Sequence, residues 1–329
     1  MVCAPSGSRS GSSGRRGADV YKGLSVAAVV PAYNEQRLIA RVIETMPALV
    51  DRIFIVDDNS SDGTGEVALA TGDKRVVVIR HERNTGVGGA VLDGHRRVIA
   101  EGIDIAVVMA GDAQMDPAYL GALLDPLADE GYGFTKANRF FSMDSFRGMP
   151  SHRLWGSVAL GFLTKLASGY WHLFDPQNGY TAIRRTALER LPLDSIELGY
   201  PFENDMLIHL NILGIRARDV PVPAVYGEEV SGMRLHRVAP AIGFTLFRGF
   251  WKRIWWKYVL WNFSPIAMLF FSGLALTLFG FLFGVGVFVV AVRGTTPTAA
   301  TVMISVGPLL VGINLLVQAL VLDIQESPR

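Results

Sequence analysis

The sequence has almost no cysteine and almost no excess charge. Cys3 is the only cysteine in 329 residues, which excludes intrachain disulfides and cysteine-based metal sites. The formal net charge of +1 argues against a nucleic-acid-binding surface. The chain also lacks the dinucleotide glycine fingerprint and a Gly-Lys-Ser/Thr phosphate loop, so it does not indicate a hydride-transfer enzyme or a P-loop protein.

The first 23 residues lack apolar periodicity. Residues 1–23 are rich in Ser, Gly and Arg, and we expect a disordered tail. No apolar core of a secretory signal is present in this stretch, so we expect the domain that follows to stay in the cytoplasm.

Apolar residues are in excess, and the excess is concentrated after about residue 240. Half of the residues are hydrophobic and the mean hydropathy is +0.30, which is high for an ordinary soluble domain. Residues 263–292 and 294–322 carry no charge. Each stretch exceeds the roughly 20 apolar residues that cross a bilayer. We therefore predict a transmembrane hairpin over residues 263–324, with helices at about 263–292 and 299–322.

Basic and aromatic side chains alternate directly before the first apolar span, over residues 233–262. This mixture is typical of amphipathic helices lying in a membrane interface. A nucleic-acid-binding segment has a similar composition, but the neighbouring apolar spans exclude it here. Because the positive charge precedes the first span, we predict an integral membrane protein with its large domain on the cytoplasmic face.

Strands and helices alternate in the first half of the chain. Short apolar runs predict strands at residues 25–30, 53–56, 76–79 and 103–109. Helical spacing predicts helices at 35–47, 86–100 and 118–127. Short links between them imply βαβ units and a mostly parallel sheet. Further on we expect strands at 133–137, 180–183 and 220–223, and helices at 151–168 and 206–213.

Polar side chains follow three of these strands. Residues 31–35 follow the first strand, Asp57 and Asp58 the second, and Asp112 and Gln114 the fourth. Carboxyl ends of parallel strands meet at one sheet edge, where α/β proteins bind ligands. Asp and Gln oxygens are ligands that Mg²⁺ or Mn²⁺ accepts beside a diphosphate. Each residue alone is equally consistent with a helix cap or a turn; together they favour a binding crevice.

Three further groups of residues have two interpretations each. Gly88 begins a helix and favours close packing over a phosphate cradle. Arg153 and Ser157 share a helix face and can bind an anionic oxygen, or can form a solvated face. Glu203 and Asp205 precede the helix at 206–213 and can complement its dipole.

Five motifs in this order resemble glycosyltransferase family 2. They are Pro31-Ala-Tyr-Asn-Glu35, Asp57-Asp58-x-Ser60-x-Asp62-x-Thr64, Asn84-x-Gly-x-Gly88, Asp112-x-Gln114 and Asp175-Pro-Gln-x-Gly179. Within the family, residues 24–232 resemble the polyprenyl-phosphate glycosyltransferases, including the dolichyl-phosphate mannose and glucose synthases. The resemblance implies a GT-A (Rossmann-like) α/β domain that transfers a hexose, with inversion, from a nucleotide-sugar to polyprenyl (dolichyl or undecaprenyl) phosphate. A homo-oligomer is compatible with it.

The resemblance also implies roles for individual residues. The donor nucleotide would be bound by Pro31, Tyr33, Glu35, Asp57, Asp58 and Gly88. Asp112 and Gln114 would hold Mg²⁺ or Mn²⁺. The acceptor phosphate would be held by Arg139, Arg153 and Ser157. A loop with Ser231 and Arg234 would close over the site, and Glu203 and Asp205 would lie near the sugar.

The chain departs from the family at one position. Ala110 stands where the family's D-x-D motif has its first Asp. Mg²⁺ commonly keeps waters and uses substrate phosphates, so a site with Asp112, Gln114 and the diphosphate, or with help from Asp116, remains consistent. The Gln-Met-Asp-Pro sequence after Ala113 resembles that of family members that use UDP-sugars more than that of the mannose synthases, which implies a UDP-sugar rather than GDP-mannose as the donor.

Two alternatives remain open. The missing Asp allows a catalytically silent nucleotide-sugar-binding membrane scaffold. A processive polysaccharide synthase of the same family would carry a Gln-x-x-Arg-Trp motif and more membrane spans. This chain has Arg153-Leu-Trp155 and two expected spans, so the synthase is disfavoured.

Overall fold

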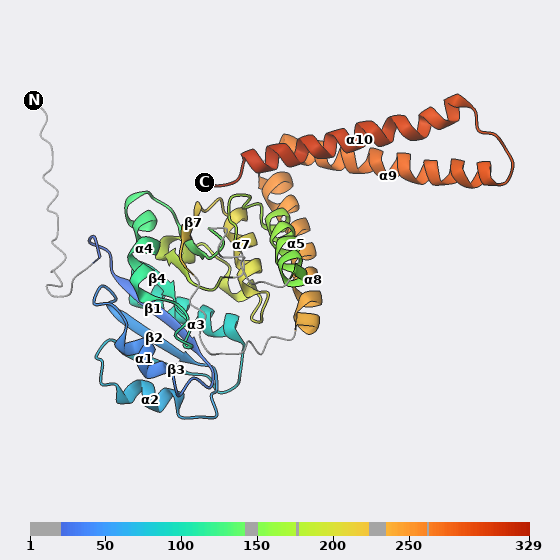
Figure 1. Cartoon of the computed structure of the whole chain (residues 1–329). Coiled ribbons are helices and arrows are strands. Elements are labelled where there is room, and N and C mark those ends of the chain that lie inside the picture. Colours follow the sequence, from blue (N-terminus) through green and yellow to red (C-terminus); the bar gives the residue numbers. More distant parts are fainter. Residues whose placement is uncertain (1–20, 142–150, 176–177, 224–234, 262) are drawn as a thin grey trace, which may run out of the picture.

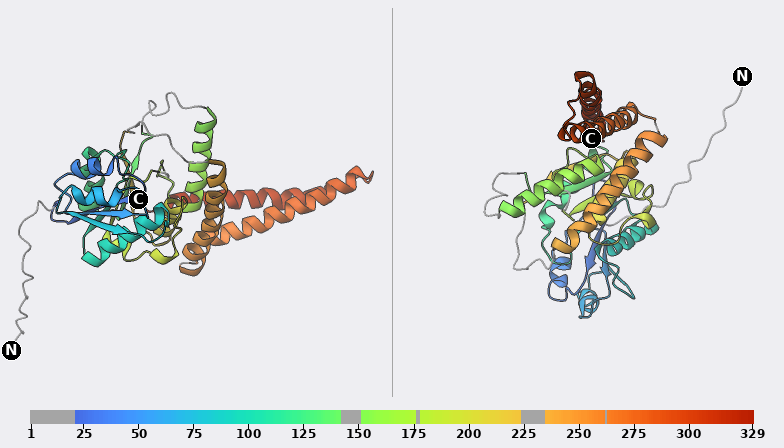
Figure 2. Two further views of the ribbon diagram at one scale, coloured as in Figure 1. Left: turned by 90° about the horizontal axis from the view of Figure 1, so that it is seen from below. Right: turned by 90° about the vertical axis from the view of Figure 1, so that its right-hand side faces the viewer.

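The computed structural model describes residues 21–141, 151–175, 178–223, 235–261 and 263–329 (Figure 1). It does not describe the side chains of residues 151–154, 157 and 235–238. A central sheet has helices on both faces. Two helices lie along one side of this domain, and a long helical hairpin projects away from it (Figures 1 and 2).

In the described part of the chain, seven strands form one sheet in the order β3-β2-β1-β4-β6-β5-β7. The strands are β1 (Val26–Ala32), β2 (Arg52–Asp57), β3 (Val76–Arg80), β4 (Ile105–Val108), β5 (Phe134–Asn138), β6 (Thr181–Arg184) and β7 (Ala217–Pro221). Strand β6 runs antiparallel to both of its neighbours, and every other adjacent pair is parallel. The predicted mostly parallel sheet is confirmed, with β7 at an edge.

The helices of the domain lie close to their predicted positions, with three differences. They are α1 (Ile39–Glu44), α2 (Thr64–Ala70), α3 (Val87–Glu101), α4 (Leu120–Asp129), α5 (Ser151–Ser168), α6 (Arg185–Leu188) and α7 (Phe202–Ile212), with 3-10 turns η1 (Pro117–Tyr119) and η3 (Leu193–Ser195). Helix α1 is shorter than the predicted helix at 35–47, and the two short helices α2 and α6 were not predicted. Helix α7 begins at Phe202, so Glu203 and Asp205 lie in its first turn.

Strand β1 is central because both of its faces are buried. Val26, Ala28 and Val30 pack in the cluster that includes residues of α1 and α4. Ala27 and Val29 pack in the opposite cluster, with residues of α3 and α7. Helices on both faces explain the continuous apolar run, which is typical of a parallel sheet.

The C-terminal part begins with α8 (Leu235–Arg253) and a π-helical segment, η4 (Ile254–Trp261). Helices α9 (Pro265–Val292) and α10 (Ala299–Gln325) follow, and both are long and apolar enough to cross a membrane. Only 6% and 11% of the residues in their most apolar windows are buried, so these are not core helices of the domain. Helix α10 extends beyond the predicted end at residue 322.

Small residues line the contact between α9 and α10. Gly273 on α9 faces Gly312 on α10, and Gly280 faces Ser305. On each helix the two small residues are seven positions apart. A Cβ atom on Gly280 would lie 2.6 Å from the backbone nitrogen of Leu309. The two backbones therefore approach closely, as small residues allow in membrane helix pairs.

Candidate functional site

The loops after β1 and β2 are bound to each other at the carboxyl edge of the sheet. The backbone N–H of Asn34 donates to Ser60 Oγ (3.0 Å), and that of Glu35 donates to Thr64 Oγ1 (2.9 Å). Ser61 N–H donates to Asn34 Oδ1 (2.9 Å), and Asn34 has a φ of 58°. The hydroxyl residues of the second motif thus satisfy backbone donors of the first.

Asp58 connects the end of β2 to the loop before α3. Its buried carboxylate accepts hydrogen bonds from the backbone N–H groups of Thr85 (2.7 Å) and Gly86 (2.8 Å). The Thr85 hydroxyl (3.0 Å) and His81 Nδ1 (2.8 Å) also contact it. Burial alone would raise the pKa of Asp58, but these hydrogen bonds lower it below its ordinary value. The carboxylate is therefore fixed in the ionised form.

Asp57 is also buried, with 1% of its surface exposed. Its Oδ1 accepts the backbone N–H of Ser60 (2.8 Å), and its Oδ2 lies 3.8 Å from Arg80 Nε. Tyr33, in contrast, is 52% exposed at the same edge. The predicted nucleoside-binding residues therefore include a rigid carboxylate pair and a side chain accessible to a ligand.

The turn after β4 lies against the end of β1. Gly111 N–H donates to Pro31 O (3.2 Å), and a Cβ atom on Gly111 would lie 3.4 Å from Glu35 Cγ. Asp112 Oδ1 accepts the backbone N–H of Gln114 (3.0 Å), and Ala113 between them has a φ of 58°. The turn brings Asp112 to the edge where the first two loops meet, as predicted from the sequence.

A divalent metal fits this turn only in combination with a bound diphosphate. Within the described ranges, no three His, Cys, Asp or Glu side chains converge as a metal-binding group. Asp116 caps the η1 turn by accepting Ala118 N–H (2.9 Å), so it is engaged elsewhere. Asp112 and Gln114 supply one carboxylate and one amide oxygen. This set suits Mg²⁺ or Mn²⁺ that takes its other ligands from phosphate and water.

The start of α3 is covered by the segment that precedes α7. A Cβ atom on Gly88 would lie 2.6 Å from Leu198 O and 2.7 Å from Phe202 Cβ. Gly89 N–H donates to Leu198 O (3.2 Å). This contact favours the packing interpretation of Gly88 over a phosphate cradle.

Arg139 is oriented by a buried carboxylate. Its Nε lies 2.7 Å from Asp175 Oδ2, and its Nη2 lies 3.1 Å from Asp175 Oδ1. Asp175 has 1% of its surface exposed, whereas the Arg139 side chain is 38% exposed. A two-point contact of this kind fixes the plane of the guanidinium. Asp175 belongs to a motif noted in the sequence, but no role was predicted for it.

Further charged groups lie near the pair of Arg139 and Asp175. Burial raises the pKa of Glu203, and the positive charges of Lys136 and Arg139 oppose that rise. Burial also raises the pKa of Asp219 to about 6, although Asp219 accepts Phe174 N–H at 2.7 Å. Lys136 is buried and donates to the carbonyl of Asn178. Sequence reasoning missed Lys136 and Asp219, which lie within the strand pattern rather than in a motif.

Asp205 has a structural partner. Its Oδ2 accepts the backbone N–H of Glu197 (3.0 Å), and 2% of its surface is exposed. His209 Nδ1 lies 3.6 Å from its other oxygen. The carboxylate thus fixes the segment before α7, and a role near the sugar stays a prediction.

Four predicted residues are not placed in full. Arg153 and Ser157 lie in α5, but their side chains are outside the described atoms. Ser231 and Arg234 lie outside the described residues altogether. Their assignments remain predictions.

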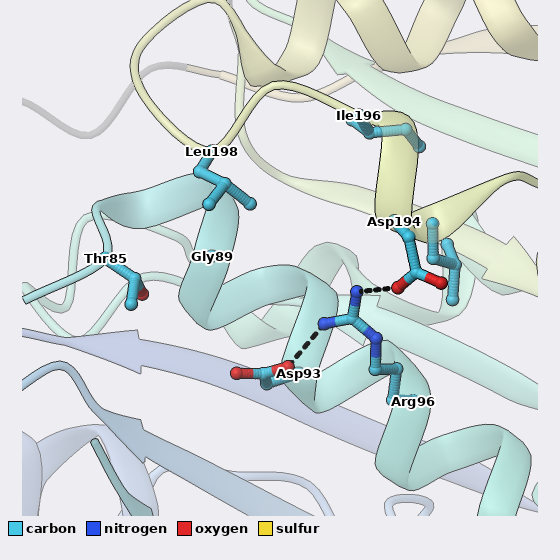
Figure 3. Close-up of a pocket in the computed structure, with 8 residues that line it drawn as sticks. Thr85, Gly89, Asp93, Arg96, Asp194, Ile196 and Leu198 are labelled. Carbon is cyan, nitrogen blue, oxygen red and sulfur yellow. Dashed lines mark hydrogen bonds and ion pairs between the residues drawn. The ribbon is translucent and has the colours of Figure 1, made fainter. Parts of the chain in front are cut away.

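A cavity of about 220 Å³ lies beside α3 and is lined in part by Thr85, Arg96 and Leu198 (Figure 3). Arg96 in its wall is paired with Asp93 (2.5 Å) and Asp194 (2.7 Å). Because two carboxylates already neutralise this guanidinium, the cavity is a poor diphosphate site. The carboxyl edge of the sheet remains the candidate.

The family follows from a sequence match over the same region. Residues 27–192, about half of the chain, match the family described as Glycosyl transferase family 2. The chain belongs to glycosyl transferase family 2. It is therefore a glycosyltransferase, and the matched residues extend from strand β1 to strand β6 of the α/β domain.

Family members with known names are similar over most of their length. A UDP-N-acetylglucosamine–dolichyl-phosphate N-acetylglucosaminyltransferase of Methanococcus voltae is 28% identical, over 61% of this chain and 85% of its own. A polyprenol monophosphomannose synthase of Mycolicibacterium smegmatis is 30% identical, over 66% and 83%. An undecaprenyl-phosphate mannosyltransferase of Micrococcus luteus is 32% identical, over 62% and 85%.

A solved structure supports the fold assignment. The glucosyl-3-phosphoglycerate synthase of Mycobacterium tuberculosis, in complex with Mn²⁺, UDP-glucose and phosphoglyceric acid, is 25% identical. It aligns with a TM-score of 0.52 over 70% of this chain and 80% of its own. The predicted GT-A fold of this glycosyltransferase is thereby confirmed.

Proposed function

We propose that this enzyme transfers one hexose from a nucleotide-sugar to a membrane-embedded polyprenyl phosphate, with inversion at the anomeric carbon. A UDP-sugar is the favoured donor. The names of the relatives support the lipid-phosphate acceptor. The observation that carries the proposal is a polar carboxyl edge of the sheet in the same molecule as an exposed aromatic surface and two membrane-length helices.

The exposed aromatic surface is formed by α5 and α8, which lie side by side in Figure 2. Trp155, Val158 and Phe162 of α5 are 71%, 52% and 54% exposed, at i, i+3 and i+7 spacing. Phe244 and Phe247 of α8 are each 65% exposed. Large apolar side chains grouped on an exposed face mark a membrane contact. The sequence predicted this role for the α8 segment but not for α5.

Transfer requires no protein base. A phosphate monoester has its second pKa near about 6, so the acceptor is mostly dianionic at neutral pH. Its oxygen forms the new bond to the anomeric carbon, while the bond from that carbon to the diphosphate oxygen breaks. A divalent ion on Asp112 and Gln114 would neutralise the charge that builds up on the departing diphosphate. Asp57 and Asp58 hold the surrounding loops in place.

Basic side chains then orient the acceptor. Arg139, whose plane is fixed by Asp175, and Arg153 with Ser157 hold the acceptor phosphate and reduce repulsion between the two anions. Residues 24–232 form the catalytic domain, residues 233–262 lie in the interface, and residues 263–324 span the bilayer. The domain faces the cytoplasm, where nucleotide-sugars are made.

The full-length enzyme in detergent, supplied with Mg²⁺ or Mn²⁺, tests this proposal. Labelled UDP- and GDP-sugars are each incubated with a polyprenyl phosphate. We expect one UDP-sugar to give an organic-soluble, mild-acid-labile product that carries a single sugar. Binding of nucleotide-sugars without transfer would instead support the silent scaffold, and a polymer would support the polysaccharide synthase.

Arg153→Ala separates the acceptor site from the donor site. We expect it to lower the transfer rate by about 10²-fold, the effect of losing one group that stabilises or positions a transition state. The affinity for the nucleotide should not change. If purified Arg153→Ala makes lipid-linked sugar at the wild-type rate, Arg153 does not hold the acceptor.

A further inference from the structure

An ion pair is buried where the hairpin meets the domain. Arg253 is the last residue of α8, and Asp323 lies near the end of α10. Their exposed fractions are 0% and 5%. Arg253 Nη1 lies 2.5 Å from Asp323 Oδ1, and Nη2 lies 3.1 Å from Oδ2. Residues 70 positions apart in the chain are thus joined by a two-point contact.

The remaining atoms of the pair bind three other segments. Arg253 Nε donates to Ala167 O (3.0 Å), and Nη2 donates to Leu166 O (3.0 Å), both at the end of α5. Asp323 accepts the indole N–H of Trp171 (2.9 Å) and the hydroxyl of Tyr258. The pair therefore joins α5, α8, the π-helical segment and α10 at one point.

Asp323 continues the face of α10 that packs on α9. Ser305, Gly312 and Ala319 are the buried residues of this face, at spacings of seven, and Asp323 follows four residues later. A slip or rotation of α10 against α9 would therefore remove Asp323 from Arg253. The ion pair is the buried, charged contact among those that fix the hairpin on the domain, which also include the rings of Phe250 and Trp251 against Phe270 and the hydrogen bond between His172 and Ser327.

Stability alone does not explain such a pair. Moving two charges out of water is expensive, and well-packed apolar residues often stabilise a site equally well. Directional contacts do give one defined geometry, because every hydrogen bond of the guanidinium and the carboxylate constrains it.

We propose that Arg253 and Asp323 are positioning residues that hold the catalytic domain at a fixed height and angle on the bilayer. The effect on catalysis rests on the proposed function, because the sugar must then reach a phosphate whose depth is set by the membrane. The ion pair acts on the acceptor step and not on donor binding. Its loss should therefore affect long-chain acceptors in a bilayer far more than soluble ones.

The kinetic test compares two acceptors with purified full-length variants in proteoliposomes. For Asp323→Asn we expect the KM of a long-chain polyprenyl phosphate to rise by about 10²-fold, the scale of an ångström-sized misplacement. The KM of a short-chain, water-soluble prenyl phosphate and the affinity for the nucleotide-sugar should stay within about twofold of wild type, since neither depends on bilayer depth. Asp323→Glu should recover part of the loss.

Arg248→Gln is the matched control. Arg248 also lies on α8 and pairs with Glu197 of the domain (3.1 Å), but this pair is exposed. Its removal should therefore change the KM of neither acceptor. If the KM of both acceptors rises equally in Asp323→Asn, or if neither KM rises, the proposal is overturned.

A distance measurement tests the positioning independently of activity. Spin labels at Thr296→Cys, between the two long helices, and Ala70→Cys, on α2, in a Cys3→Ser chain report the angle of the hairpin. We expect a narrow distance distribution in wild type and in Arg248→Gln, and a broad one in Asp323→Asn. If wild type transfers no sugar, the proposed function fails while this measurement still decides the positioning. An unchanged distribution in Asp323→Asn contradicts it.

Discussion

At residue scale, Ala110 stands where the family resemblance implies the first Asp of a D-x-D motif. Its methyl group cannot coordinate an ion, and its backbone N–H donates to Met115 Sδ (3.2 Å). Asp112 would supply the carboxylate of a metal site in this turn, whereas Asp116 caps η1. The affinity for a metal therefore depends on how much the diphosphate contributes.

Ala110→Asp should restore a second carboxylate and tighten Mn²⁺ binding in the presence of UDP. A directly coordinating oxygen should matter at least as much as an outer hydrogen-bond partner, which changes metal affinity by about 10–100-fold. Calorimetric titration of Mn²⁺ into the enzyme with UDP measures the change. Ala110→Asn has the same size without the charge and should gain much less. A gain for Asn equal to that for Asp would exclude coordination by a carboxylate here.

His95 is a second residue with a measurable consequence. It is completely buried on α3, and neither ring nitrogen has a hydrogen-bond partner within the described residues. Burial lowers its pKa from 6.5 to about 3. The folded protein therefore keeps this imidazole neutral at pH values where the unfolded chain protonates it.

His95 should make the domain less stable in acid. Above pH 6.5 neither state binds the proton. Below it only the unfolded state does, so the free energy of unfolding falls by about 1.4 kcal/mol per pH unit from this residue. The loss continues down to the folded pKa of about 3. Thermal unfolding from pH 7.5 to 5 should show a smaller decline in His95→Leu than in wild type. Parallel declines in the two proteins would contradict this account.

The residue types of the candidate site were predictable, but their partners were not. The order of motifs pointed to Asp58 and Asp112, and the family resemblance pointed to Arg139. That Asp58 fixes the loop before α3, or that Asp175 orients Arg139, depends on strands distant in sequence. Lys136 and Asp219 were missed because a charged residue inside a strand carries no local indication of burial. Such a residue is buried only by the strands that lie next to it in the folded protein.

At element scale, the hairpin depends on close backbone contact. Gly280 on α9 has no room for a side chain, whereas Gly286, six residues later on the same helix, has no atom within 4 Å of an added Cβ. The two residues are therefore the same type in the same helix and differ only in whether they pack against α10.

Gly280→Val should separate α9 from α10 and destabilise the hairpin by about 1–3 kcal/mol, the usual cost of overpacking. Gly286→Val should have little effect, because its side chain points into open space. Thermal inactivation in one detergent compares the two. Equal destabilisation would show that β-branching in the helix, rather than the contact with α10, is responsible.

Element boundaries were predicted where periodicity was strong and missed where tertiary contacts decide. The strands and α5 follow their apolar patterns closely. Helix α2 has only Thr64, Gly65 and Ala68 buried, so it has almost no apolar stripe to detect. The exposed face of α5 could not be recognised because an apolar stripe has the same spacing whether it faces a core or a membrane.

At the scale of the whole molecule, the account requires one orientation in the membrane. Basic residues of α8 and η4, among them Arg248, Lys252 and Lys257, precede the first apolar helix, and the chain returns to the domain after the second. The positive-inside tendency supports the proposed cytoplasmic position of the domain.

Thr296, between the two long helices, should then lie outside. In a Cys3→Ser chain, Thr296→Cys should react with a membrane-impermeant maleimide in intact cells, and Ala70→Cys on α2 should react only after permeabilisation. The reverse pattern would place the domain on the outer face.

The most direct test of the central claim is the fate of the sugar. Wild-type enzyme and Asp112→Ala are incubated with a labelled UDP-sugar, polyprenyl phosphate and Mg²⁺, and the lipid fraction is analysed by mass spectrometry. The account predicts a polyprenyl phosphate with one added hexose in wild type and its loss, by about 10²-fold or more, in Asp112→Ala. Equal amounts of this product in both proteins, or none in wild type with any UDP- or GDP-sugar, would contradict it.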